Sequence, residues 1–159
     1  MLVVLGAGGM YRWLGSPAVI DPVSAEKAER DKVLQMVEAL AQRLKDNPDN
    51  PRGWAMLARS YKVMGRLDDA MQAYSQTGTL LETEPDLMAD YADLLAVRAG
   101  DRLEGVPMEL VRKALTINPK HPMSLMLVAA QSYREGKFAD AISHWETLLT
   151  VVDPQSQDA

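Results

Sequence analysis

The chain has no cysteine, one phenylalanine and two histidines among its 159 residues. Without cysteine, disulfides, thiolate metal sites and thiol nucleophiles are excluded. Basic residues are also in the minority, since 17 Lys and Arg face 22 Asp and Glu, for a net charge of -5. Neutralisation of phosphates supplies most of the affinity of nucleic-acid-binding proteins, so an acidic chain without a basic cluster argues against a nucleic-acid partner.

Recognisable catalytic and metal-binding patterns are missing as well. His121 and His144 lack the HExxH spacing of zinc enzymes, and each is better explained as a surface or half-buried histidine than as a ligand. The GAGG run at Gly6–Gly9 lacks the Lys-Ser/Thr of a phosphate-binding loop, and no GxSxG motif is present. The sequence therefore predicts neither an enzyme nor a resident cofactor or metal.

What is present favours helices. Hydrophobic residues make up 47% of the chain and charged residues 25%, which is typical of one globular domain. Alanine, leucine, methionine and glutamate are common, and these residues prefer helix to strand. We expect an all-α fold.

The N-terminal segment is apolar but short. Residues 1–10 carry no charge, yet a membrane-spanning helix needs about 20 apolar residues. No positive charge precedes the run, so it does not read as a signal peptide. Two interpretations stay open: residues 1–15 are either an apolar leader or the distal half of a membrane helix, with Tyr11 and Trp13 at the interface.

An internal repeat organises the rest of the chain. A first series of positions recurs as a second series 71 residues later, which is two units of 34 residues plus three. The first series is Trp54, Leu57, Ala58, Gly65, Ala70 and Tyr74, and the second is Leu125, Val128, Ala129, Gly136, Ala141 and Trp145. A helix-turn-helix period of 34 residues is the signature of tetratricopeptide repeats.

The residue types in the repeat have physical reasons. Small Ala70 and Ala141 are expected where the two helices of a unit approach closely, and Gly65 and Gly136 where the turn needs positive φ. The three extra residues must lie in the loop Ala99–Val106 of a degenerate middle unit.

The predicted architecture is a tetratricopeptide-repeat solenoid with one lone helix followed by three helical pairs. Residues 16–23 form a linker, Ser24 caps the lone helix, and the repeat domain spans 24–152. The terminal helix, 138–151, is expected to cap the core, and residues 153–159 form a tail.

Solenoids of this kind use an extended concave surface for binding, and the first helix of each unit lines it. Positions 2, 5, 9 and 12 of each unit are predicted to point into this groove. They are Arg52, Ala55, Arg59 and Lys62 in the first unit, Asp86, Ala89, Asp93 and Ala96 in the second, and Met123, Met126, Ala130 and Tyr133 in the third. The groove would be basic, then small and acidic, then apolar, which suits an amphipathic partner helix.

Several stretches also resemble a known family. They are RLKDNPDNPRGWAMLARSY, DYADLLA, KALTINPKHPMSLML and AISHWETLL, and YRWLGSPAVIDP in the leader. Through them residues 36–154 resemble the periplasmic repeat domain of the c-type cytochrome biogenesis family (CcmI/CycH/NrfG).

This resemblance implies a periplasmic assembly factor that is tethered to the inner membrane by its N-terminus and is not an enzyme. It implies binding of the C-terminal helix of an apocytochrome c in the groove, and delivery to haem lyase subunits. The chain departs from membrane-anchored members in lacking the first membrane helix and most of the second, which puts the anchor in question. A general protein-interaction scaffold for another complex is the alternative.

Overall fold

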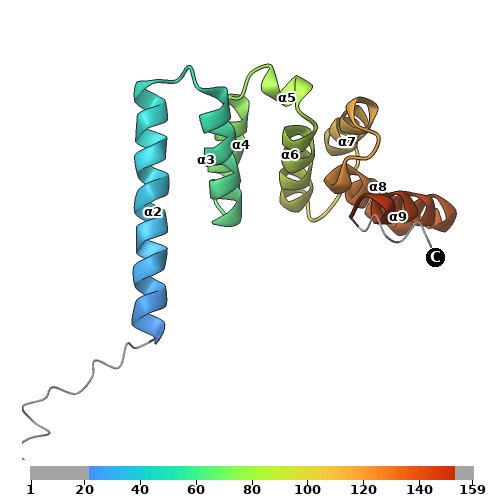
Figure 1. Ribbon diagram of the computed structural model, residues 1–159, viewed down its shortest axis with the longest axis horizontal. Coiled ribbons are helices and arrows are strands. Elements are labelled where there is room, and N and C mark those ends of the chain that lie inside the picture. Colours follow the sequence, from blue (N-terminus) through green and yellow to red (C-terminus); the bar gives the residue numbers. More distant parts are fainter. Residues whose placement is uncertain (1–21, 153–159) are drawn as a thin grey trace, which may run out of the picture. The chain divides into compact units, whose positions relative to one another are not determined.

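The computed structural model describes residues 22–152, and all the regular secondary structure in this part of the chain is helical, as predicted. The helices are α2 (Pro22–Asp46), α3 (Pro51–Val63), α4 (Leu67–Ser75), α5 (Leu80–Thr83), α6 (Pro85–Arg98), α7 (Val106–Ile117), α8 (Pro122–Arg134) and α9 (Phe138–Val152), as Figure 1 shows. The chain divides into two compact units, Met1–Ala39 and Leu40–Ala159.

Within the first unit, the described part of α2 starts at Pro22, two residues before the predicted domain boundary. Proline suits a first helical turn because its missing N–H would have no intrahelical partner there. Ser24 consequently lies inside the helix and is not its N-cap, which corrects the prediction. The leader at 1–15, most of the linker and the tail at 153–159 lie outside the described residues.

The second unit contains three helical pairs, α3/α4, α6/α7 and α8/α9. Gly65 and Gly136 make the turns of the first and third pairs with φ of 73° and 74°, as the repeat predicted. Ala70 and Ala141 are 0% exposed where the paired helices meet. The 71-residue offset therefore reflects a repeated three-dimensional unit.

The joint before α3 explains one conspicuous run of the sequence. Asn50 caps α3, since its side-chain oxygen accepts a hydrogen bond from the Gly53 N–H at 2.9 Å. Trp54 donates its indole N–H to the Pro48 carbonyl at 2.9 Å. These bonds fix how the chain enters the first pair.

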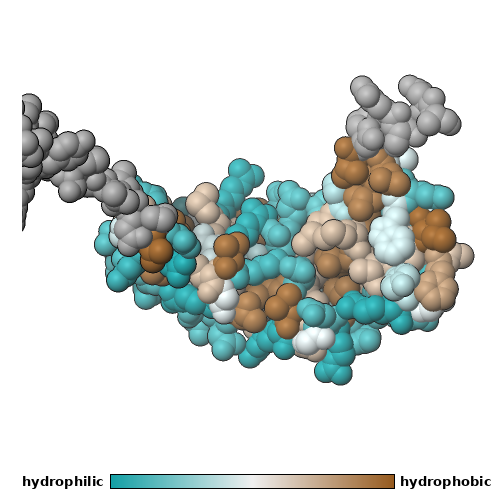
Figure 2. Space-filling model, turned by 90° about the horizontal axis from the view of Figure 1, so that it is seen from below, coloured by the Kyte–Doolittle hydropathy of each residue, from teal (hydrophilic) through white to brown (hydrophobic). Residues whose placement is uncertain are grey.

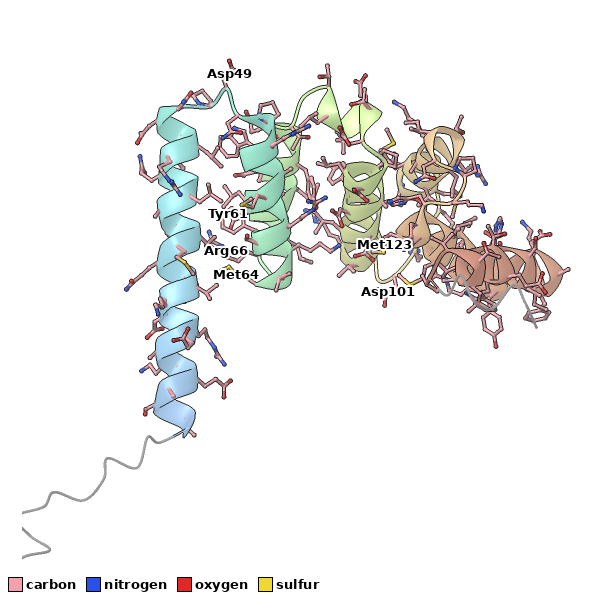
Figure 3. The ribbon with its side chains drawn as sticks, viewed as in Figure 1. Asp49, Tyr61, Met64, Arg66, Asp101 and Met123 are labelled. Carbon is pink, nitrogen blue, oxygen red and sulfur yellow. The ribbon has the colours of Figure 1, made fainter. Side chains whose placement is uncertain are left out.

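A hydrophobic core links the second and third pairs. Its buried members are Ala89, Ala92, Ala96, Leu103, Met108, Val111 and Leu127. Leu103 comes from the inserted loop between α6 and α7 and is 2% exposed. Arg134 of α8 donates to the Asp101 carbonyl of the same loop, which Figure 3 labels below α6. The three-residue insertion is thus folded against the third pair.

Two features of the second unit were not predicted. The single-turn helix α5 precedes α6. The terminal helix α9 does not bury its apolar side chains as a cap would, because Ala141 is its one buried residue among those described. Figure 2 shows brown, apolar surface gathered at the α8–α9 end. The expectation that the terminal helix caps the core is therefore wrong for the described residues.

No helix among residues 22–152 has both the length and the apolar composition needed to span a membrane.

Candidate partner-binding surface

The predicted groove residues come from α3, α6 and α8, the first helices of the three pairs. Contacts join α3 to α6 and α6 to α8. We call the surface formed by these three helices the first-helix face. The twelve predicted positions are distributed along it, but they differ in how far they are available to a partner.

Ion pairs join α3 to α6. Arg59 Nε lies 2.5 Å from the Asp90 carboxylate, and Lys62 Nζ lies 2.5 Å from that of Asp93. Lys62 also donates to the Asp90 backbone carbonyl at 3.4 Å. Of the charged positions predicted for separate zones of the groove, Lys62 and Asp93 are therefore paired with each other. Arg59 is paired with Asp90, which is not among the twelve predicted positions.

Burial and charge act in opposite directions on Arg59. Partial burial alone would lower the pKa of the guanidinium, but the hydrogen bond and the charge of Asp90 outweigh it and raise the pKa. Asp90 keeps 24% of its side chain exposed, against 48% for Arg59. The pair therefore sits at the edge of solvent, where such contacts contribute about 1 kcal/mol or less.

Tyr74 of α4 is completely buried near these charges, and its ring lies 5.1 Å from that of Tyr91 on α6. Its hydroxyl has no hydrogen-bond partner among the described residues. Burial, and then the charge of Asp90, raise the pKa of this phenol above its ordinary value. This neutral phenol ties the first pair to the second.

A third polar contact joins α6 to α8. His121 Nε2 lies 2.8 Å from the Asp86 carboxylate, and its Nδ1 accepts a hydrogen bond from the Ser124 N–H at 3.2 Å. His121 is 5% exposed, so the predicted surface or half-buried histidine is buried and caps α8. His144 is partly buried on α9.

The remaining polar position, Arg52, is exposed and makes no ion pair with any described residue.

The small residues of the predicted groove lie mostly in the packing between helices. Ala55, Ala89 and Ala96 are 4%, 0% and 4% exposed. Their lack of bulk lets helices approach closely, so in this conformation they shape the first-helix face without offering contact area to a partner.

The apolar positions of α8 behave differently. Met126 and Tyr133 are 46% and 56% exposed. Met123 is partly buried against the core and is labelled between α6 and α8 in Figure 3, and Ala130 is also partly buried. The α8 end therefore supplies the apolar contact area of the first-helix face.

Sequence reasoning missed the cross-repeat pairs, although a signal was available. Arg59 and Asp90 are separated by 31 residues, as are Lys62 and Asp93. This is the 34-residue period less three, so each cation faces a position one helical turn earlier in the next unit. Opposite charges at that offset would have indicated contacts between consecutive repeats.

The described residues include no cluster of three His, Cys, Asp or Glu side chains that could hold a metal ion. Paired helices with glycine turns, stacked through alanine contacts and carrying a continuous face of first helices, define a tetratricopeptide-repeat solenoid.

The family is shown by comparison with known sequences. Residues 19–159 match the family model described as "Cytochrome c-type biogenesis protein H TPR domain". The chain belongs to this family.

Curated relatives agree with that membership. The chain is 34% identical over 141 residues to "Cytochrome c-type biogenesis protein CycH" of Rhizobium meliloti, covering 87% of this chain and 37% of the relative. It is 26% identical to CycH of Pseudomonas aeruginosa, covering 96% and 37%. It is also 24% identical to "Formate-dependent nitrite reductase complex subunit NrfG" of Escherichia coli O157:H7, covering 85% and 68%.

The chain thus spans 37% of the length of these CycH relatives. Among solved structures, the crystal structure of MamA superposes with a TM-score of 0.63 at 16% identity, covering 81% of this chain and 73% of that one. The likeness supports the solenoid fold.

Proposed function

We propose that this chain is a non-catalytic assembly factor for c-type cytochromes, which holds the C-terminal helical segment of an apocytochrome c on its first-helix face and presents it to subunits of the haem lyase complex. Membership of the biogenesis family and the names of its CycH relatives support this role.

One observation favours the α8 end of that face as the anchoring point. Met126 and Tyr133 stay about half exposed there, whereas Arg59, Lys62 and Asp86 are engaged with neighbouring helices. Methionine adapts to varied apolar partners, and an aromatic side chain offers large contact area at low entropic cost. An amphipathic helix would therefore place its apolar stripe against α8.

The proposed location is the periplasm, where c-type cytochromes are assembled by the family that the sequence resembles. Residues 1–15 would tether the domain to the inner membrane. A general scaffold for another complex is the second candidate, and it is favoured by the relative named as a subunit of the nitrite reductase complex.

The test is a titration of the full chain with labelled C-terminal peptides of an apocytochrome c from the same organism. A scrambled peptide and the folded holocytochrome are the controls. We expect saturable binding of the native peptide alone, weakened about tenfold or more by Met126→Glu, since a charge would enter the apolar contact.

Ile117→Glu provides a matched protein control, because Ile117 is an apolar residue of α7, outside the first-helix face, and is 48% exposed. Binding of the scrambled peptide as tightly as the native one would exclude the apocytochrome role. Native binding that Met126→Glu leaves unchanged would move the contact away from α8.

A further inference from the structure

The terminal helix α9 carries an exposed apolar stripe. Its members follow one another at spacings of 4, 3, 4 and 3 residues, which is the spacing of a helix-packing seam. They are Phe138 (56% exposed), Ile142 (52%), Trp145 (38%), Leu149 (53%) and Val152 (61%). We call these five residues the α9 stripe, and they belong to the end where Figure 2 shows apolar surface.

The internal repeat supplies a reference for this stripe. Leu67, Met71 and Tyr74 of α4 lie 71 residues before Phe138, Ile142 and Trp145. On α4 the same positions are covered: Leu67 and Met71 are partly buried, and Tyr74 is 0% exposed.

The structure also shows that α6 covers these positions of α4. The Tyr74 ring packs on Tyr91 of α6 at 5.1 Å, and Arg98 of α6 donates a hydrogen bond to the Met71 sulfur at 2.9 Å. The second pair repeats the arrangement, because α7 packs on α8 and its Val111 is 0% exposed. In both preceding pairs, therefore, the second helix is covered by the first helix of the next pair.

Aromatic contacts prepare one end of the α9 stripe for such a helix. Tyr133 packs edge-on against Phe138 at 5.4 Å and tilted against Trp145 at 5.9 Å. All three rings keep more than a third of their surface exposed, so they form a preassembled apolar platform.

The charge of α9 indicates which charged side chain a covering helix should carry. The helix contains Asp140 and Glu146 but neither lysine nor arginine. At the α4–α6 contact, Arg98 of the covering helix pairs with Asp68 of the covered one at 3.0 Å. Asp140 stands one residue beyond the equivalent of Asp68. A cation on the covering helix would find a carboxylate here.

We propose that the α9 stripe is a docking site for an amphipathic α-helix of a partner protein, one with an aromatic or large aliphatic residue for Trp145 and a lysine or arginine for Asp140. The five residues of the α9 stripe are not among the predicted first-helix positions, although Tyr133 of α8 contacts two of them. The inference goes beyond the proposed function.

The natural probe is the helix that covers α4. A fluorescein-labelled peptide with the sequence of Pro85–Arg98, held helical by a side-chain staple between positions 86 and 90, is titrated with the full chain. We expect saturable binding by anisotropy, weakened at least tenfold by Ile142→Asp and by Leu149→Asp. Replacing the tyrosine at position 91 of the peptide by alanine should weaken binding as well.

Val63→Asp is the matched control, because it places the same charge at another exposed apolar residue, and it should leave peptide binding unchanged. Met126→Glu should also leave it unchanged, while Ile142→Asp should not alter the apocytochrome titration. The two proposals can therefore fail independently.

The docking proposal is overturned by absence of saturable binding, or by equal binding to Ile142→Asp and Val63→Asp. Sedimentation of the peptide-free chain gives a further outcome against it: a concentration-dependent dimer that Ile142→Asp abolishes would mean that a second copy covers the α9 stripe.

Discussion

His121 connects two repeats through opposite edges of one ring. Its Nε2 lies 2.8 Å from the Asp86 carboxylate on α6, and its Nδ1 accepts the Ser124 N–H that opens α8. Because Nδ1 is an acceptor, the proton of the neutral ring must be on Nε2, which then donates to Asp86. The cap of one helix and its contact with the preceding pair therefore depend on the same side chain.

Replacing His121 should therefore cost both contacts. His121→Ala is expected to lower the free energy of unfolding by about 1–2 kcal/mol, the usual cost of a lost helix cap. His121→Asn, which offers an amide oxygen in place of Nδ1 as the capping acceptor, should recover part of that loss. Urea denaturation monitored by circular dichroism measures both, and equal stability of the alanine variant and the parent would contradict the capping role.

The Lys62–Asp93 pair should couple the first two repeats. Its side chains are 21% and 26% exposed, so solvent screens the pair less than a fully exposed one. A double-mutant cycle of Lys62→Met and Asp93→Asn should give a coupling of about 0.5–1 kcal/mol. The exposed Glu26–Arg30 pair of α2 is the control, with a smaller expected coupling. A value near zero for Lys62 and Asp93 would show that the contact does not hold the repeats together.

Tyr74→Phe should stabilise the fold. The substitution removes a buried hydroxyl that lacks a partner among the described residues, and we expect a gain of about 1 kcal/mol in unfolding free energy. Chemical denaturation at neutral pH measures the gain. Thr77→Val is the contrast, because the buried Thr77 hydroxyl donates to the Tyr74 carbonyl at 2.6 Å, and its loss should destabilise.

The same phenol gives stability a pH dependence. Because burial raises the pKa of folded Tyr74 above its ordinary value of 10.0, the folded chain keeps a proton that the unfolded chain releases. The contribution of this raised pKa to the free energy of unfolding is complete below the ordinary pKa of tyrosine. It is lost as the pH rises above that pKa. Denaturation at about pH 8 and about pH 11 should show a smaller alkaline loss for Tyr74→Phe than for the parent.

Ala141 should not tolerate bulk. It is 0% exposed between α8 and α9, so Ala141→Trp is expected to cost roughly 1–3 kcal/mol by overpacking. Ala139→Trp, at an exposed position of the same helix, should be close to neutral. Thermal denaturation compares the two. Equal melting temperatures for both variants would mean that Ala141 does not face α8 and that the assigned register of α9 is wrong.

The fold could be predicted because its main determinants recur. Ala70 and Ala141 are small for the same packing reason, and Gly65 and Gly136 have positive φ for the same turn, so a 71-residue offset was visible in the sequence. The lone helix began earlier than expected because Pro22 can occupy a first turn as well as end a linker.

The polar part of the candidate surface was harder to predict. The sequence identifies which residues lie on first helices, but it does not show that Lys62 reaches Asp93 instead of solvent. The environment of His121 depends equally on Asp86, which comes from another repeat. Predicting such contacts requires knowing how two helices are placed relative to each other. The spacing of apolar residues within one helix shows only which of its own faces is buried.

Apart from the contact of α5 with α6, the principal contacts of the second unit fall within one helical pair or between adjacent pairs. Such a chain can fold stepwise, because each pair can add to a neighbour that is already formed. Local unfolding is then expected to begin at the terminal pairs. With Ala141 as its single buried residue, α9 should exchange its amide protons faster than α6, and the domain would loosen by fraying from its C-terminal pair before it melts as a whole.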